Sequence, residues 1–364
     1  MSNAPKTAPA TEPNATDTDV LVRTAGALGR LTLNRPKAIN ALSLEMVRQL
    51  QVGLDRFEQD DAITVVLLDG AGDRGLCAGG DIIALRDAAQ SGEHEPAHTF
   101  WIEEYVLNAR IASYPKPIVA IMDGVVMGGG IGLAGHASHR LATERLVSAM
   151  PEVGIGFAPD VGGTWLLSRG DGELGTHLAL TGDRLGAHDA IAAGLADRIV
   201  ASEALEQLAA DLESGDLEAA IEAAEAIDVE IPAGKLSGAR GWINAAYAYD
   251  TVEQIVAALE ASDGEGPEKA LKAIRRASPT SLKVTLRALR SARELPSLEA
   301  ALTQELRVSC GFLSGDDFVE GVRAQVVDKD RNPQWKPATL EDVSDSELDR
   351  YFAPLGAGDL EFNA

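Results

Sequence analysis

Apolar and polar positions alternate along residues 20–200 with two different periods. Short apolar runs rich in β-branched residues and bounded by Gly, Pro or Asn predict strands. The predicted strands are Val20–Arg23, Leu28–Asn34, Ile63–Asp69, Ile118–Met122 and Leu146–Ala149. A helical period follows Ser43 and places Leu44, Val47, Leu50, Leu54 and Phe57 on one face. This alternation of strands and helices predicts an α/β fold.

The composition changes after Val200, where Ala, Glu and Leu dominate. The predicted helices of this region, residues 201–364, are Glu203–Glu213, Leu217–Ala226, Val252–Glu260 and Ser297–Ser309. Breaks are expected at Gly234–Gly241 and Asp263–Pro267, and the acidic side chains should form a solvated face. Residues 1–19 are rich in Ala, Pro, Thr and Asn without a long apolar segment, which predicts a disordered tail and no signal peptide.

One predicted helix, Thr99–Tyr114, carries a carboxylate within its apolar stripe. Phe100, Glu104, Leu107 and Ile111 share a face. By pattern alone, Glu104 fits equally well as a residue at the edge of the stripe and as part of a buried site.

Two glycine-rich turns follow predicted buried strands. Gly75–Ile82 reads GLCAGGDI, and Gly128–Gly130 is a triple glycine. Each turn presents a backbone amide, at Gly80 and Gly129, that no side chain covers. Two such amides converging on one oxygen would form an oxyanion hole, although a triple glycine by itself is more often a flexible turn.

Two further carboxylates, Glu152 and Asp160, lie in a segment otherwise made of Val, Ile, Phe, Ala, Gly and Pro. Burying carboxylates in such surroundings is costly unless they have partners or a chemical role. The alternatives are a first-turn helix residue for Glu152 and a turn or cap residue for Asp160. The combination with two glycine turns favours an active site.

Several motifs together resemble the crotonase (enoyl-CoA hydratase/isomerase) superfamily, and within it the 3-hydroxyisobutyryl-CoA hydrolase branch. The superfamily motifs are NRPKAINAL, CAGGDI, KPIVAIMDGVVMGGGIGL, AMPEVGIGFAPDVGGT and TGDRLGAHDAIAAGLAD. The branch motifs are EEYVLN, HRLATE, PDVGG and FVEGVRAQVVDKDRNPQW. The resemblance covers Val20–Pro337, nearly the whole chain.

The resemblance implies a spiral of ββα units over residues 20–200, with a helical C-terminal part that closes over the ligand and contacts other subunits of a possible homo-oligomer. It implies hydrolysis of a short 3-hydroxyacyl-CoA, with 3-hydroxyisobutyryl-CoA of valine breakdown as the best candidate and no cofactor. The implied catalytic residues are Glu152, Asp160, Gly80 and Gly129; the implied substrate contacts are Glu104, Gly129, Glu152, Asp160, Ala78 and Lys37.

One position separates hydrolysis from hydration within the superfamily. Hydratases carry a second glutamate three residues after the oxyanion glycine, and here that position is Gly132. Asp160 falls where the hydrolase branch has aspartate. An enoyl-CoA hydratase or isomerase is the alternative, and a catalytically silent acyl-CoA-binding protein is a third hypothesis, against which Glu152, Asp160 and both glycine turns argue.

The net charge of the chain limits the kinds of molecule that it can bind. A net charge of −24 argues against binding nucleic acid or an anionic membrane. Coenzyme A is itself an anion, and Arg35, Lys37 and Lys329 are candidate phosphate contacts, each equally well explained as a solvated surface residue. No apolar run reaches the roughly 18 residues of a membrane helix.

Cys77 and Cys310 are the two cysteines, which indicates a reducing compartment, and we expect the cytoplasm. Cys77 has no nearby histidine to activate it as a nucleophile. The six histidines lack metal-ligand spacing, and we expect His136 and His139 to be structural residues of a polar turn.

Overall fold

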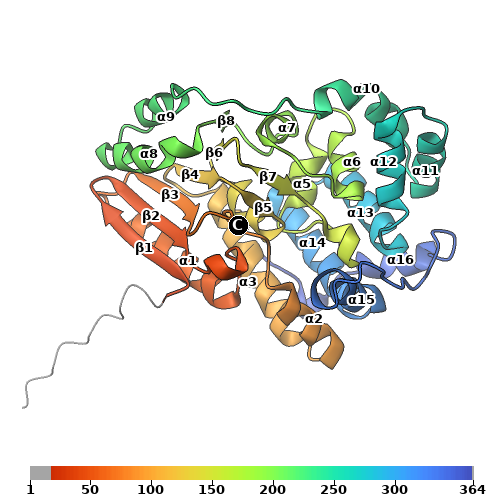
Figure 1. Ribbon diagram of the computed structural model, residues 1–364. Coiled ribbons are helices and arrows are strands. Elements are labelled where there is room, and N and C mark those ends of the chain that lie inside the picture. Colours follow the sequence, from red (N-terminus) through yellow and green to blue (C-terminus); the bar gives the residue numbers. More distant parts are fainter. Residues whose placement is uncertain (1–17, 363–364) are drawn as a thin grey trace, which may run out of the picture.

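A mixed sheet forms one half of the computed structural model, which describes residues 18–362 (Figure 1). The order of its six strands is β1-β2-β3-β4-β6-β8; β1 and β2 are antiparallel and the other pairs are parallel. A second, parallel sheet pairs β5 with β7. The strands are β1 Val20–Ala25, β2 Leu28–Leu33, β3 Val65–Gly70, β4 Ile118–Met122, β5 Val125–Met127, β6 His139–Ala142, β7 Val147–Ala149 and β8 Arg198–Ile199. All but the last two residues of the predicted tail, 1–19, lie outside the described residues.

The five predicted strands are confirmed, with small shifts at their ends. The strands β5, β6 and β8 were not predicted, and they have three, four and two residues. His139 begins β6 and pairs with Val119, so its placement in a turn was wrong.

Helices cover both faces of the main sheet, because the central strands carry apolar side chains on both sides. In β3, Val66 and Leu68 belong to the core that includes α1 and α3, whereas Val65 and Leu67 pack under α8 and α9. Continuous apolar runs are typical of such doubly covered parallel strands. The helices up to Val200 are α1 Leu44–Gln59, α2 Ile82–Ser91, α3 Glu95–Ala112, α4 Gly129–Ala134, α5 Gly163–Ser168, α6 Leu174–Thr181 and α7 Ala187–Ala192, with the short turns η1 Pro36–Ala38 and η2 Glu152–Ile155.

The C-terminal region is helical, and most of it lies beside the sheet rather than on it (Figure 1). Its helices are α8 Leu205–Asp211, α9 Leu217–Glu225, α10 Leu236–Tyr247, α11 Val252–Glu260, α12 Glu265–Ile274, α13 Pro279–Ala292, α14 Leu298–Leu313, α15 Asp316–Val322, the π-helical turn η5 Arg323–Val327 and α16 Asp345–Tyr351; η3 Ser202–Ala204, η4 Leu212–Ser214 and η6 Gly356–Gly358 are single 3₁₀ turns. The four predicted helices are confirmed. The two predicted breaks were wrong over most of their length, because α10 and α12 begin inside them. The crotonase-like α/β fold with a helical C-terminal part is confirmed.

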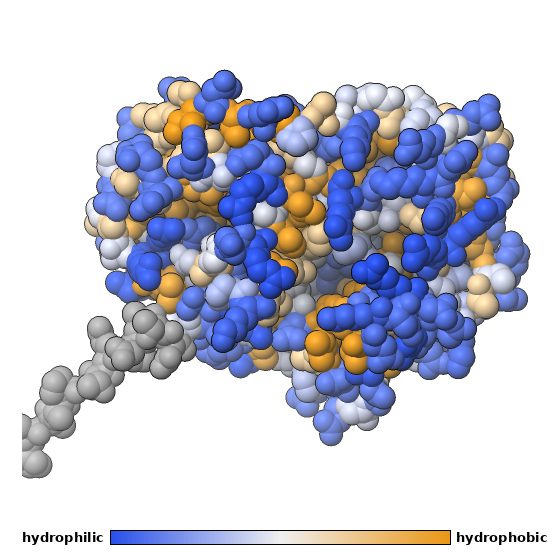
Figure 2. Space-filling view, in the orientation of Figure 1, coloured by the Kyte–Doolittle hydropathy of each residue, from blue (hydrophilic) through white to orange (hydrophobic). Residues whose placement is uncertain are grey.

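The surface in Figure 2 is mostly hydrophilic, and hydrophobic residues reach it beside a hollow near the centre of this face. Among residues 18–362, no helix is both long and apolar enough to cross a membrane.

Candidate active site

A cavity of about 230 Å³ lies where the two glycine turns meet α3 and η2. Its lining includes most of the site residues singled out from the sequence: Ala78, Gly80, Glu104, Gly129, Glu152 and Asp160. Lys37 is not among the lining residues and lies exposed on η1. The structure therefore brings together groups from four separate segments and leaves Lys37 outside.

Aromatic side chains form the apolar part of this cavity. Trp101 of α3 stacks on Phe157 with ring centroids 5.6 Å apart, and Phe157 contacts Phe318 of α15 at 5.2 Å. Phe100 lines the same space. These rings exclude water from the carboxylates beside them, which strengthens every electrostatic interaction there.

The two glycine turns touch each other at the cavity. A Cβ atom placed on Gly129 would lie 3.3 Å from the amide nitrogen of Gly80 and 2.7 Å from Oε1 of Glu104. Gly128 has φ 49° and ψ −120°, a conformation that side chains disfavour. Within the described part of the chain, the amides of Gly80 and Gly129 donate no hydrogen bond. Two unused backbone donors therefore lie side by side next to a carboxylate.

Glu104 and Glu152 are both buried, with 2% and 6% of their surfaces exposed. Oε1 of Glu104 and Oε2 of Glu152 have no hydrogen-bond partner among residues 18–362. Burial, and secondarily the charge of nearby Asp160, raises the pKa of both carboxyls well above the usual range. Buried carboxylates with an unused oxygen are placed to act on a ligand that enters the cavity.

Asp160 is held by an aromatic hydroxyl. Tyr105 Oη donates to Oδ2 of Asp160 at 2.9 Å and lies 2.9 Å from Oγ of Ser309. Burial raises the pKa of Asp160 to about 7, although the hydrogen bond from Tyr105 opposes this shift. Asp160 is thus a buried carboxyl with a raised pKa, and Tyr105 holds one of its oxygens.

Glu305 of α14 fixes the turn that follows Asp160. Its carboxylate accepts hydrogen bonds from the amides of Gly162 (2.6 Å) and Thr164 (2.9 Å) and from the Thr164 hydroxyl (2.5 Å). Burial raises its pKa to about 8. Sequence reasoning missed Glu305, because no local pattern distinguishes it from the other acidic residues of the C-terminal region.

The position of the second hydratase glutamate is filled by neighbouring side chains. A Cβ atom on Gly132 would lie 2.6 Å from Cβ of Val161 and 3.0 Å from Nδ2 of Asn108. Val161 has φ 54°, which is rare for a β-branched residue, and its carbonyl accepts a hydrogen bond from His136 Nε2 at 2.8 Å. The chain therefore lacks the second hydratase glutamate at position 132, and Val161 and Asn108 also leave no room for a side chain there.

The remaining polar candidates have structural surroundings. His136 is buried, and burial lowers its pKa to about 4. Burial raises the pKa of Cys77 to about 12, so this thiol is a poor nucleophile. Arg35 donates to the Ala41 carbonyl at 2.7 Å and pairs with Asp81 at 3.4 Å. Among residues 18–362, no group of three His, Cys, Asp or Glu side chains is arranged to hold a metal ion.

The glycine turns, the buried carboxylates and the spiral of strands and helices define a crotonase-type site. The chain belongs to the enoyl-CoA hydratase/isomerase family, whose sequence profile matches residues 28–352. It is 43% identical to the mitochondrial 3-hydroxyisobutyryl-CoA hydrolase of Rattus norvegicus and 40% identical to that of Homo sapiens. Both alignments span 352 residues and cover 94% of this chain and 91% of the relative.

Two solved structures are also similar. One is a carnitinyl-CoA dehydratase from Mycobacterium thermoresistibile, with TM-score 0.90 and 47% identity over 95% of this chain and 99% of that chain. The other is an enoyl-CoA hydratase from Rhodobacter sphaeroides, with TM-score 0.88 and 42% identity over 95% of this chain and 100% of that chain. The resemblance to the crotonase superfamily and to its hydrolase branch is confirmed.

Proposed function

We propose that this protein hydrolyses a short 3-hydroxyacyl-CoA thioester to the free acid and CoA, with 3-hydroxyisobutyryl-CoA of valine breakdown as the leading substrate. The observation that carries the proposal is Glu152, a buried carboxylate whose free oxygen shares one cavity with two unused amides. The names of the hydrolase relatives support the same reaction.

The amides of Gly80 and Gly129 form the proposed oxyanion hole. They would bind the thioester oxygen and hold the negative charge that develops when the carbonyl carbon becomes tetrahedral. Removing one such donor in comparable sites costs about 2.7–4 kcal/mol of transition-state stabilisation.

Ionised Glu152 begins the reaction by one of two routes. As a nucleophile, its oxygen bonds to the carbonyl carbon, the C–S bond breaks, the thiolate leaves and is protonated, and water then hydrolyses the mixed anhydride. As a general base, Glu152 takes a proton from water, the resulting hydroxide displaces the thiolate, and the proton passes to the sulfur. One turnover in ¹⁸O-water tests the nucleophilic route. If water attacks the Glu152 carbonyl of the anhydride, the bond from that carbon to the bridging oxygen breaks and the label enters the Glu152 side chain, which the general-base route never labels.

Asp160 and Glu104 are proposed to orient the 3-hydroxyl group and the attacking water. Tyr105 donates a hydrogen bond to Oδ2 of Asp160, which restrains the position of the carboxylate. Ala78 lines the cavity beside Gly80 and is proposed to contact the thioester. Lys37 remains a proposed surface contact of the CoA portion.

Hydration of an enoyl-CoA is the second candidate, because the two similar solved structures are named as a dehydratase and a hydratase. The packing of Gly132 against Val161 argues against it, since hydration in this family uses a carboxylate there. The deciding experiment measures thiol release and enoyl absorbance with 3-hydroxyisobutyryl-, 3-hydroxypropionyl- and crotonyl-CoA. We expect thiol release from the hydroxyacyl esters; rapid loss of enoyl absorbance without thiol release would establish a hydratase.

The setting of the reaction is also proposed. We propose a cytoplasmic enzyme, supported by two free cysteines, although the named hydrolase relatives are mitochondrial. Light scattering on the purified protein tests the expected homo-oligomer. A silent acyl-CoA-binding protein, the third hypothesis, would bind these esters without releasing thiol.

A further inference from the structure

One face of α14 contacts the surroundings of Asp160 at two points. Glu305 and Ser309 are four residues apart on this helix, so they share a face, and both are buried. Ser309 acts on the side chain: since Tyr105 uses its one hydroxyl proton on Asp160, the Ser309 hydroxyl donates to Tyr105 at 2.9 Å. Glu305 acts on the backbone that follows Asp160. The helix therefore restrains both the carboxylate and the chain next to it.

The Asp160 turn, residues 160–164, has an unusual backbone. Val161 and Gly162 have φ values of 54° and 76°, both in the left-handed region, which a β-branched residue rarely adopts. The Gly163 amide closes the turn by donating to the Asp160 carbonyl at 2.6 Å. Backbone in such a conformation persists only when surrounding contacts fix it. A change in the contacts of this turn is therefore expected to move Asp160.

Glu305 supplies contacts of this kind. Within the described part of the chain, every hydrogen bond of Glu305 ends on the Asp160 turn: Oε2 accepts from the Gly162 amide, and Oε1 accepts from the amide and the hydroxyl of Thr164. The side chain is 1% exposed, so water does not compete for these bonds. Glu305 does not line the catalytic cavity, and it can therefore act on a bound substrate only through the turn.

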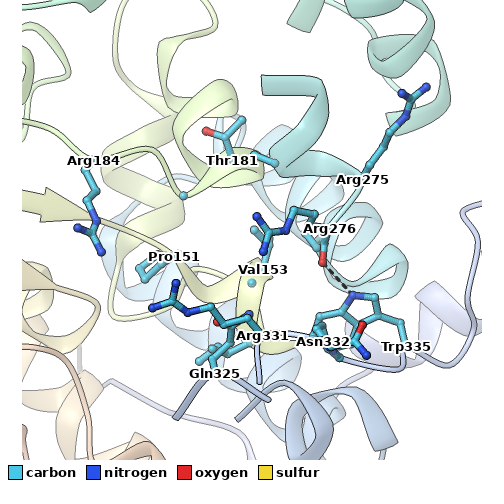
Figure 3. Close-up of a pocket in the computed structure, with 16 residues that line it drawn as sticks. Pro151, Val153, Thr181, Arg184, Arg275, Arg276, Gln325, Arg331, Asn332 and Trp335 are labelled. Atoms are coloured by element: carbon cyan, nitrogen blue, oxygen red, sulfur yellow. Dashed lines mark hydrogen bonds between the residues drawn. The ribbon is translucent and has the colours of Figure 1, made fainter. Parts of the chain in front are cut away.

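Glu152 is held by a different set of contacts. The carbonyl of Val153, the next residue of η2, accepts a hydrogen bond from the Ser278 amide at 3.2 Å. Two residues before Ser278, the carbonyl of Arg276 accepts the indole N–H of Trp335 at 3.0 Å, which fastens this segment (Figure 3). Val153, Arg276 and Trp335 line one cavity on the far side of η2 from the catalytic cavity. The contacts that hold η2 are therefore separate from those that α14 makes with the Asp160 turn.

We propose that Glu305 is a positioning residue that makes the site selective for a 3-hydroxyacyl group, because it holds the turn that orients Asp160. The inference rests on the proposed function, in which Asp160 orients the 3-hydroxyl of the substrate. The alternative is a purely structural role, as a cap for the first turn of α5. Positioning and capping differ in their consequences: loss of positioning slows esters with the hydroxyl more than esters without it, whereas loss of a cap slows both alike or only lowers stability.

Three variants separate these roles. In Glu305→Gln, the side-chain oxygen can still accept from Thr164, but the amide group cannot accept from Gly162, so one bond to the turn is lost. Thr164→Val is milder, because it removes only the hydroxyl bond. Gln304→Met is the matched control: Gln304 is the neighbouring buried residue of α14, but it donates to the carbonyl of Ala288 at 3.1 Å and not to the turn.

The measurement is the ratio of kcat/KM for thiol release from 3-hydroxyisobutyryl-CoA to that from isobutyryl-CoA, which lacks the hydroxyl. A change in the ionisation of Glu152 affects both esters and cancels in this ratio. We expect Glu305→Gln to lower the ratio on the order of tenfold, comparable to the loss of one hydrogen bond. Thr164→Val should lower it less, and Gln304→Met should leave it at the wild-type value. A wild-type ratio in both Glu305→Gln and Thr164→Val would overturn the proposal.

A double variant tests whether Glu305 acts through Asp160. Asp160→Asn by itself should already lower the ratio, and adding Glu305→Gln should lower it no further, because the two residues then act in one chain of contacts. Effects on the ratio that multiply in the double variant would mean that Glu305 acts independently of Asp160, which would overturn the proposal.

Binding of inert analogues keeps this inference separate from the proposed function. In these analogues a methylene group replaces the thioester sulfur, so no thiol can be released. By calorimetry, the wild type should bind the 3-hydroxyisobutyryl analogue more tightly than the isobutyryl analogue, and Glu305→Gln should reduce this difference several-fold. The same difference in both proteins would overturn the inference. A reduced difference, in a protein whose wild type hydrolyses neither ester, would support the positioning of Asp160 and refute only the proposed function.

Discussion

Gly132 offers the sharpest test of why this site lacks the second hydratase glutamate. It lies inside α4, where even a Cβ atom would approach Val161 Cβ to 2.6 Å and Asn108 Nδ2 to 3.0 Å. Val161 has little freedom to yield, because its φ is 54° and its carbonyl is bonded to His136. We therefore expect Gly132→Ala to destabilise the fold, although alanine is the better helix former.

The magnitude follows from two opposing effects. Overpacking a core costs about 1–3 kcal/mol, and a 2.6 Å contact with a fixed neighbour places Gly132→Ala near the upper end. The gain in helix propensity returns about 1 kcal/mol, which leaves a net loss of about 2 kcal/mol. Gly238 in α10 is the matched control: a Cβ atom there meets nothing within 4 Å, so Gly238→Ala should gain up to about 1 kcal/mol.

Denaturant unfolding of the two variants measures this difference directly, and the expected gap between them is about 3 kcal/mol. Gly132→Glu should be less stable still, because it also buries a carboxylate, and should not gain crotonyl-CoA hydration. The reasoning is refuted if Gly132→Ala is as stable as Gly238→Ala, or if Gly132→Glu hydrates crotonyl-CoA at wild-type stability.

Three further expectations follow from the buried carboxylates. Burial raises the pKa of Glu305 to about 8, so its protonation stabilises the fold fully below about pH 4, and this contribution is lost as the pH rises to about 8. The melting temperature of Glu305→Gln should therefore vary less with pH between these values than that of the wild type. An equal pH dependence of the two melting temperatures would contradict the raised pKa. Asp160, with a pKa of about 7, and Glu152, whose pKa is also raised, should both act ionised, so wild-type kcat/KM should fall at low pH. Asp160→Asn should move this fall to lower pH rather than remove it, because the charge of Asp160 helps to raise the pKa of Glu152. The same variant should slow 3-hydroxyacyl esters more than acyl esters without the hydroxyl, and equal slowing would contradict the role of Asp160. Thiol release should be unaffected by EDTA, whereas inhibition that zinc reverses would contradict the proposed metal-free mechanism.

Local sequence patterns predicted the longer elements and missed those that depend on distant contacts. The apolar run of β4 and the face of α1 are explicit in the sequence. The strands β5, β6 and β8 have too few residues to show a period, and pairing with neighbouring strands stabilises them. The helices α10 and α12 begin in glycine-rich stretches, where tertiary packing outweighs the low helix propensity of glycine.

The residues of the catalytic cavity could be predicted in part. The apolar surroundings of Glu152 and Asp160 and the two glycine turns indicated the site, and the family resemblance implied the role of each group. Glu305 could not be separated from the many solvated acidic residues of the C-terminal region, because its role depends on a contact with Gly162 across 143 positions.

The most direct test of the account is the rate of thiol release from 3-hydroxyisobutyryl-CoA by Glu152→Gln. This variant keeps the size of the side chain but removes the charge and the nucleophilic oxygen, while the amides of Gly80 and Gly129 remain. We predict that kcat falls by about 10²–10⁴-fold, the span of a positioned acid–base group, with little change in KM. Thiol release at a near wild-type rate would contradict the account, because Glu152 would then be only the first residue of η2.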